Sequence, residues 1–252
     1  MDKLGNHNLV MTLQKFDDTL LSDYMDGFWG YGATNADYWF VGMEEGGGDS
    51  FEEITQRISQ WNKRGRNPLE DLYEYHMDIN VPKWFQKNAP LQPTWNKLIR
   101  VLLVAKGKNP EKEFVRSYQI EQLGRSNGEV CLLELLPLPS PTTNHWLYSK
   151  HSDISALSTR EIYTQKIGLN RSRKITMLIL KHQPKFVMFY GVGYLDWWQK
   201  VANTKLTPKT LHNKIAYFGK LENTKIVVSQ HPVATGVSLD YFHEIGQHLS
   251  VL

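Results

Sequence analysis

The sequence has a single cysteine, Cys131, among 252 residues. A disulfide framework, a four-cysteine zinc site and a cysteine-ligated iron–sulfur cluster each need more than one cysteine, so this count excludes all three. We therefore expect a protein that resides inside a cell, in the cytoplasm. Cys131 itself lies within an apolar run and is expected to be an inert core residue.

Long apolar stretches are also missing. None approaches the roughly 20 consecutive apolar residues that span a bilayer. The first residues, MDKLGNHNLVMTLQKFDD, lack the continuous apolar core of a signal peptide. We therefore expect no membrane partner.

Neither sign of charge dominates the chain. Lys and Arg number 29 against 26 Asp and Glu, which gives a net charge of +3. Such a balance permits a polyanionic partner without requiring one. The hydrophobic fraction of 41% and the eight tryptophans indicate a folded globular protein. Because internal repeats and low-complexity linkers are absent, we predict one domain over residues 1–252.

Four short apolar runs are rich in β-prone residues. They are YWFVGM (38–43), VCLLELL (130–136), FVMFYGV (186–192) and KIVVSQ (225–230). Each run is nearly continuous rather than alternating, which favours strands that are buried on both faces of a parallel sheet.

Helical patterns lie between these runs. Residues 94–106 carry a one-sided apolar stripe with Thr94 as the expected cap, and 172–182 and 241–249 are similar. Residues 52–90 are expected to form a helical insertion. Strands that alternate with helices predict an α/β protein, here a three-layer α/β/α sandwich with a central four-stranded parallel sheet.

Ligands of such folds bind beyond the carboxyl ends of the strands, so the residues that follow each run are informative. Glu44 and Glu45 follow the first run and precede the glycines at 46–48, and the second run contains Glu134 near its end. The third leads into GVG at 191–193, and the fourth ends next to His231. These acids, the histidine and the glycine turns are expected to meet at one edge of the sheet.

The strand ends, taken in order, resemble motifs of the uracil-DNA glycosylase superfamily, closest to its single-strand-selective monofunctional branch. FVGMEEG resembles the Gly-Met-Asn-Pro-Gly turn of that branch, and ELLPL resembles its Asn-Leu-Cys-Pro-Leu stretch. GVGYL resembles its Gly-Val-Gly-Arg-Leu turn, and HPVATG its His-Pro-Ser-Pro loop. NAPLQPTWNKL (88–98) is similar to the proline-rich loop that contacts DNA phosphates. The similarity extends over residues 38–249.

The resemblance implies catalytic roles for three residues. Glu44 stands where the family has a catalytic Asp or Asn, so its carboxylate would orient a water and stabilise the positive charge on the sugar. The alternative is an exposed acid in a turn. Glu45 is either solvated or is itself the catalytic base. His231 would hydrogen-bond the base and support the departing anion.

The resemblance also implies a set of residues that contact DNA or the flipped base. Gly46 and Phe51 are expected beside the base. The glycine turns would let the backbone approach phosphates, and a wedge residue would replace the flipped base in the stack. The expected DNA-binding residues are Gly47, Pro90, Pro93, Gly191, Gly193, Thr235 and Val237.

Two departures from the family pattern bear on the substrate. Glu134 replaces an asparagine that reads uracil, and a carboxyl group there fits the N4 amino group of cytosine better. If buried and protonated, Glu134 could also donate to N3. The alternative is that it pairs with a lysine or arginine. Gly46 replaces a tyrosine that excludes 5-methyl groups, which leaves room for a bulky 5-substituent.

The expected activity is therefore that of a monofunctional DNA glycosylase that leaves an abasic site, with hydroxymethylated or glucosylated cytosine of phage DNA as the substrate hypothesis. A lyase step would need an amine, and the predicted pocket contains no lysine. We expect DNA as the partner, a monomer, and no cofactor. The alternatives are a non-catalytic nucleic-acid-binding protein of the same fold, a uracil-excising repair enzyme, and an enzyme of free nucleosides or nucleotides.

A metal site is not expected, although the chain has nine histidines. His243 and His248 are five residues apart, whereas the H-E-x-x-H motif needs a spacing of four to place both on one helix face.

Overall fold

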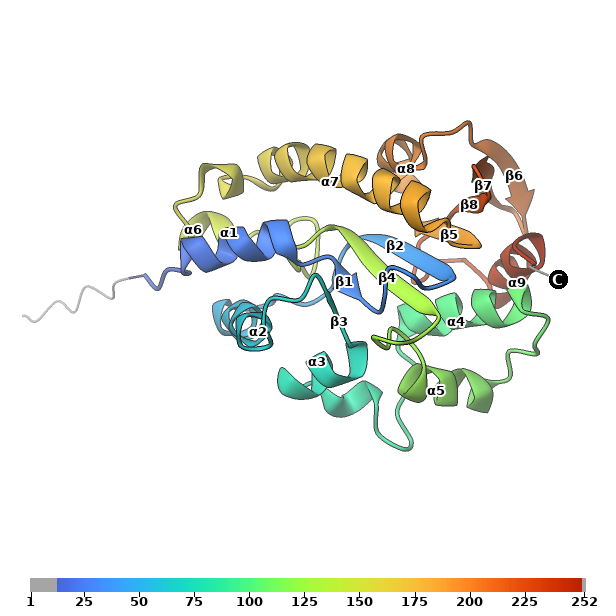
Figure 1. Ribbon diagram of the computed structural model, residues 1–252, viewed down its shortest axis with the longest axis horizontal. Coiled ribbons are helices and arrows are strands. Elements are labelled where there is room, and N and C mark those ends of the chain that lie inside the picture. The colour runs from blue at the N-terminus through green and yellow to red at the C-terminus, as the bar shows by residue number, and fades with distance from the viewer. Residues whose placement is uncertain (1–12, 251–252) are drawn as a thin grey trace, which may run out of the picture.

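The computed structural model describes residues 13–250, which are built around one sheet (Figure 1). Its eight strands lie in the order β3 (Leu69–Glu70), β1 (Gly30–Tyr31), β4 (Val130–Leu136), β2 (Tyr38–Glu44), β5 (Phe186–Tyr190), β8 (Thr224–Ser229), β7 (Lys214–Leu221) and β6 (Thr207–Leu211). The α/β class is confirmed. The sheet is larger than the four strands expected, and it is mixed rather than parallel.

The four expected strands lie side by side at the centre. Strands β4, β2, β5 and β8 are neighbours and run parallel to one another. Strand β1 pairs antiparallel with β4 at one side, and β7 pairs antiparallel with β8 at the other. The central strands are almost entirely buried, as their continuous apolar sequences predict.

The additional strands have sequences that a search for continuous apolar runs does not detect. Strands β1 and β3 have two residues each, and four of the five residues of β6 are exposed. Strands β6 and β7 form a hairpin whose turn residues, His212 and Asn213, have φ values of 43° and 62°. Positive φ at both positions is typical of a tight two-residue hairpin turn.

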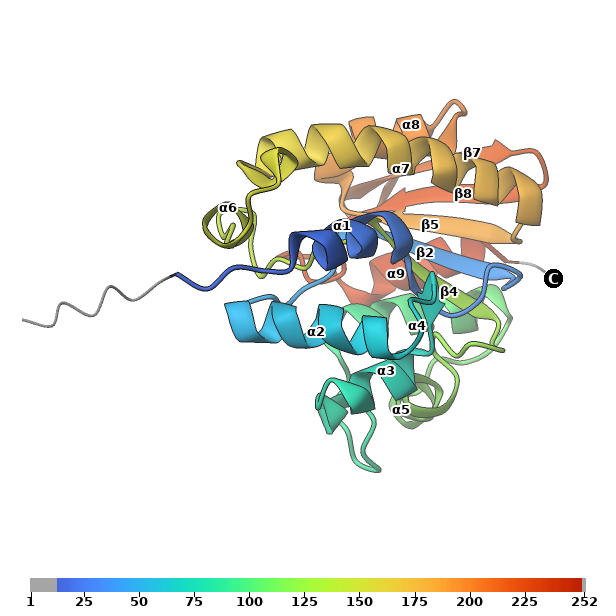
Figure 2. The same ribbon diagram turned by 60° about the vertical axis from the view of Figure 1, so that its left-hand side comes forward.

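Helices cover both faces of the sheet (Figure 2). Helices α7 and α8 lie over one face, and α3, α4 and α5 lie on the other side in both views. The helices are α1 (Asp18–Gly27), α2 (Phe51–Lys63), α3 (Leu72–Asp78), α4 (Pro93–Ala105), α5 (Lys112–Glu121), α6 (Tyr148–His151), α7 (Arg160–His182), α8 (Leu195–Ala202) and α9 (Leu239–His248). Three 3-10 turns are η1 (Pro82–Trp84), η2 (Ser155–Leu157) and η3 (Val192–Tyr194).

Two helix boundaries differ from the expectation. Helix α4 begins at Pro93, and Gln92 caps it by accepting a 2.7 Å hydrogen bond from the Trp95 amide, so Thr94 is not the cap. Proline is tolerated at this first position because its missing amide would have no partner there. Helix α7 begins at Arg160, twelve residues before the predicted start, because its first half is too polar to show a clear apolar stripe.

Residues 52–90 are not purely helical. They contain most of α2, then β3, α3 and η1, and β3 pairs with β1 at the edge of the sheet. No helix in the described part of the chain is long and apolar enough to cross a membrane.

Candidate functional site

Three residues form a row across the carboxyl-terminal part of the sheet. Gly42 of β2 is in register with Glu134 of β4, and Tyr190 ends the next strand, β5. The Tyr190 hydroxyl donates a 3.0 Å hydrogen bond to Oε1 of Glu134. A Cβ atom at Gly42 would lie 2.2 Å from the Tyr190 hydroxyl and 2.3 Å from Glu134 Oε2. Only glycine therefore leaves space for this hydrogen bond to cross β2.

Glu134 is held in surroundings that favour its neutral form. Burial raises the pKa of its carboxyl group well above the usual value, and the nearby charges of Glu45 and Glu44 raise it further. Its Oε2 is buried without a hydrogen-bond partner among residues 13–250. Glu134 forms no ion pair with any residue of the described chain. Arg171 instead donates to the main-chain oxygens of Glu134 and Leu135, at 3.0 and 2.8 Å.

Glu44 lies two residues beyond Gly42, so its side chain points to the same face of the sheet as Glu134. Its Oε1 forms an ion pair with Arg160, the first residue of α7. The side chain is 11% exposed, so the alternative of an exposed turn acid is wrong. Burial raises the pKa of Glu44, and Arg160 opposes this rise. Oε2 is buried and has no partner within the described chain.

The carboxylate of Glu45 is bound by side chains of α2 and β1. It pairs with Arg57 of α2 at 3.1 Å, and its two oxygens lie 2.9 and 3.0 Å from the Tyr31 hydroxyl, which shares its one proton between them. Its side chain is 16% exposed, so the alternative of a solvated acid is wrong. These bonds occupy both oxygens, whereas Glu44 keeps Oε2 free for a ligand. Of the two acids, Glu44 is therefore the one with an oxygen that could form a bond with a ligand.

His231 extends the row beyond β8. Its ring packs edge-on against Tyr190, with 5.7 Å between the ring centroids. Burial lowers the pKa of the imidazole, which favours the neutral ring. Gly191 adjoins His231, because a Cβ atom there would lie 3.9 Å from the histidine ring. Glu44, Glu134 and His231 are therefore at one edge of the sheet, as the sequence predicts.

The glycine loop after β2 has a mixed role. Gly46 is exposed, and a Cβ atom there would have no neighbour within 4 Å, so open space lies beside it. Gly47 has a φ of 102°, and its Cβ atom would collide with Glu53 and Arg57. The amide of Asp49, two residues later, donates a 3.0 Å hydrogen bond to Glu53. This part of the loop is bound to α2, which favours a structural role for Gly47.

The ring of Phe51, which is expected to contact the base, packs against other aromatic side chains of the fold. Phe51 is the first residue of α2, and its ring stacks on Phe16 with centroids 4.6 Å apart. The His151 ring lies 4.9 Å away. The aromatic surface of Phe51 is thus used largely to attach the segment before α1 and helix α6 to α2.

The other expected DNA-binding residues lie in three loops. Pro90 and Pro93 are exposed at the start of α4, and Gly193 is exposed in η3. Thr235 is exposed between β8 and α9, whereas Val237 in the same loop is half-buried against the core. The Gly191 amide donates a 2.9 Å hydrogen bond to the Ser229 carbonyl, so it is not available to bind a phosphate.

Sequence reasoning missed three residues of this site. A glycine inside a buried strand signals a close approach of other groups, and Gly42 could have been found in this way. Tyr190 precedes the GVG turn, but it ends the apolar run FVMFY and therefore has the pattern of one more core residue. Arg160 has no signal in the sequence, because it lies 116 residues from Glu44.

Within residues 13–250, no group of three or more His, Cys, Asp or Glu side chains could hold a metal ion. No family model matches the sequence, and no curated protein matches it either.

Proposed function

We propose that this protein is a monofunctional DNA glycosylase with a uracil-DNA glycosylase-like, three-layer architecture. It would flip a base out of DNA and hydrolyse the bond to deoxyribose, which leaves an abasic site. We propose DNA as its partner, a monomeric state and a cytoplasmic location. The preferred base is a 5-modified cytosine, hydroxymethylated or glucosylated, and the role is defence against phage DNA.

One observation carries the proposal. Glu44 and Glu134 lie on adjacent strands, point to the same face, and each keep a buried Oε2 without a partner among the described residues. Buried polar atoms are normally satisfied, so two such oxygens at the carboxyl ends of parallel strands are typical of a ligand site. His231 adds a neutral imidazole at the same edge.

The surroundings of the two carboxyl groups support different roles. Arg160 favours an ionised Glu44, which suits the stabilisation of a sugar cation and the orientation of a water. Burial and neighbouring acids favour a neutral Glu134, which has a proton to donate. Burial raises the pKa of both groups, but only Glu44 has a cationic partner that opposes the rise, and carboxyl groups in such different surroundings are typical of acid–base chemistry.

The neutral form of Glu134 also fits cytosine as the base. A protonated carboxyl group can donate to N3 of cytosine and accept from its N4 amino group. The open space at Gly46 supports a substituent at C5. The same neutral carboxyl group can donate to O4 of uracil and accept from its N3–H, so the space at Gly46, rather than Glu134, is what favours a 5-modified cytosine over uracil.

A specific observation favours a second candidate, a non-catalytic nucleic-acid-binding protein. Both acids that follow Met43 have arginine partners, Arg160 and Arg57. Glu44 therefore has a structural reason to be present, apart from any chemistry. In this candidate the ion pairs stabilise the strand end, and the loops contact DNA without cleavage of a bond.

The test is mass spectrometry of the bases released from a panel of DNAs. The panel holds uracil-containing duplex and single strands, unmodified genomic DNA, and DNA rich in hydroxymethylated or glucosylated cytosine. Glu44→Gln is the inactive control, and Glu52→Gln, an exposed acid on α2, is the matched active control. We expect wild type and Glu52→Gln to release a modified cytosine, and Glu44→Gln to release none.

Other outcomes separate the alternatives. Release of uracil would retain the glycosylase proposal and overturn the assignment of the base. Release from free nucleotides, with little dependence on salt, would indicate a nucleotide enzyme rather than a DNA enzyme. Binding of DNA without release from any substrate would support the non-catalytic candidate.

A further inference from the structure

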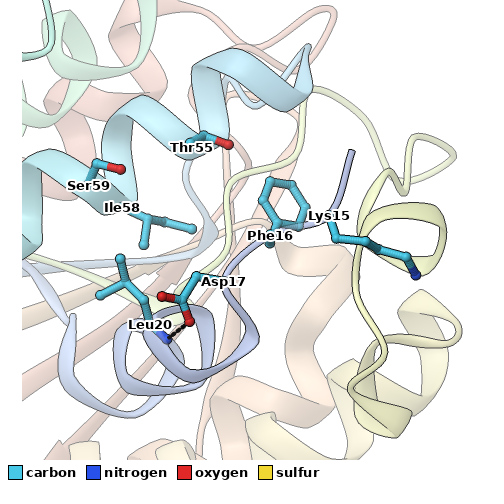
Figure 3. A pocket seen from close by; sticks show the side chains of 7 residues that line it. All are labelled: Lys15, Phe16, Asp17, Leu20, Thr55, Ile58 and Ser59. Carbon is cyan, nitrogen blue, oxygen red and sulfur yellow. Dashed lines mark hydrogen bonds between the residues drawn. The ribbon is translucent and has the colours of Figure 1, made fainter. Parts of the chain in front are cut away.

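Two hollows in the surface lie away from the row formed by Glu134, Gly42 and Tyr190. The smaller one, between α1 and α2, has a volume of about 70 Å³ (Figure 3). Its one acidic side chain, Asp17, caps α1 by accepting a 3.0 Å hydrogen bond from the Leu20 amide. The space is too small for a metabolite, and the Asp17 carboxylate already accepts a hydrogen bond within the fold.

The larger hollow, which we call the α7 groove, has a volume of about 510 Å³. One wall is formed by Lys174, Met177, Leu178 and Lys181 of α7. These positions follow the spacing i, i+3, i+4 and i+7, which places them on one face of the helix. The groove is thus bounded by a helix face with an apolar centre and a lysine at each end.

The opposite wall comes from the edge of the sheet. It is formed by Trp29, Leu69 of β3 and Leu133 of β4. This edge has only the two-residue strands β1 and β3 beyond β4, so the sheet stops short of covering the second half of α7. Met177 remains 68% exposed as a result, the largest exposed fraction among the large hydrophobic residues of the described chain.

The charge of the groove has one sign. Its lining in the described structure includes two lysines and no acidic residue. The guanidinium group of Arg171 lies 3.8 Å from the centroid of the Trp29 ring, and the Lys174 amine lies 5.9 Å from it. Lys174 and Lys181 are seven residues apart, about 10 Å along the helix axis. An apolar surface is therefore flanked by cationic groups.

We propose that the α7 groove binds a small apolar molecule that carries an anionic group, such as a carboxylate or sulfonate. The apolar part would lie between Met177 and Leu133, and the anion would pair with Lys174 or Lys181. The volume falls within the 300–1,000 Å³ that is usual for small-molecule sites. Methionine adapts its shape to different apolar partners, which suits this position. The inference is independent of the proposed glycosylase activity.

The probe for this site is anilinonaphthalene sulfonate, an aromatic anion whose fluorescence rises in apolar surroundings. We expect saturable binding of one probe per chain, displaced more strongly by decanoate than by neutral decanol. Met177→Asp places a negative charge at the centre of the groove and is expected to weaken probe binding by at least about tenfold. Met77→Asp is the matched control, because Met77 is also exposed, on α3.

A second pair of variants tests the role of charge. Replacement of both Lys174 and Lys181 by Gln is expected to abolish the preference for decanoate over decanol, since the anion loses its partners. Lys166→Gln, an exposed lysine in the first half of α7, is expected to leave the preference unchanged. Equal competition by decanoate and decanol against the wild-type protein would overturn the proposed role of the lysines.

A measurement on the unaltered protein keeps the proposal falsifiable if a variant fails to fold. The methyl resonance of Met177 is expected to shift as the probe is added, and that of Met77 is expected to stay in place. A probe that shifts neither signal, or that binds Met177→Asp as tightly as wild type, would overturn the proposal. The proposal would also be overturned if sedimentation showed that the wild-type protein dimerises and Met177→Asp does not, because a second copy of the chain would then occupy the groove.

Discussion

The Tyr190 hydroxyl donates to Glu134 at 3.0 Å over a position, Gly42, where a side chain cannot be placed. The bond fixes Oε1 of Glu134 and leaves Oε2 as the oxygen that can meet a ligand. Three adjacent strands thus cooperate to present one carboxyl oxygen.

Gly42→Ala tests this arrangement. The added methyl group would collide with the Tyr190 hydroxyl and Glu134 Oε2, so we expect a loss of about 1–3 kcal/mol in the free energy of unfolding. Urea denaturation measures this loss. Gly193→Ala is the control, because a Cβ atom there has no neighbour within 4 Å, and it should change stability by less than about 0.5 kcal/mol. Equal stability of both variants would contradict the packing described for Gly42.

The raised pKa of Glu134 predicts how stability varies with pH. Above the usual pKa of 4.5, the unfolded chain loses the Glu134 proton while the folded chain keeps it. The folded state then binds more protons, so the contribution of Glu134 to stability falls by about 1.4 kcal/mol per pH unit up to its folded pKa. Glu134→Gln removes this dependence. We therefore expect the stability of Glu134→Gln relative to wild type to rise with pH in that window. Parallel curves would contradict the neutral form.

If the protein releases bases as proposed, the ion pair between Glu44 and Arg160 predicts a shift in the pH profile of that reaction. Burial raises the pKa of Glu44, and Arg160 limits this rise. Arg160→Gln should therefore move the acid limb of the profile to higher pH, because more Glu44 is then protonated at a given pH. Single-turnover rates measured across pH would show the shift. A uniform fall in rate with an unmoved limb would mean that Arg160 does not control the charge of Glu44.

Arg171→Lys tests the buried cation behind the site. Arg171 is 2% exposed and donates to the carbonyl groups of Leu135, Glu134 and Met25. Lysine cannot reproduce this planar set of donors, so we expect a loss of roughly 3 kcal/mol in the free energy of unfolding. Thermal or urea denaturation measures it. Arg173→Lys, at an exposed position on the same helix, should be close to neutral.

The sequence by itself determined the elements whose signals are local. The four continuous apolar runs became the four central strands, because burial on both faces requires apolar residues at every position. It also placed Glu44, Glu134 and His231 at one edge, since the carboxyl ends of parallel strands meet there. The sequence did not predict strands β1 and β3, because each has only two residues. It did not predict the β6–β7 hairpin either, because the side chains there are largely polar or exposed.

Tertiary structure alone decided the partners of these residues. Arg160 reaches Glu44 across 116 positions of sequence, and Tyr190 reaches Glu134 across 56. No periodicity encodes such pairs, because they depend on which strands become neighbours and on which face each side chain points to. Those pairings place one of two similar glutamates beside a cation, whereas the other is buried beside Tyr190 and near other acids, where its pKa is raised. These different surroundings are the basis of the proposed chemistry.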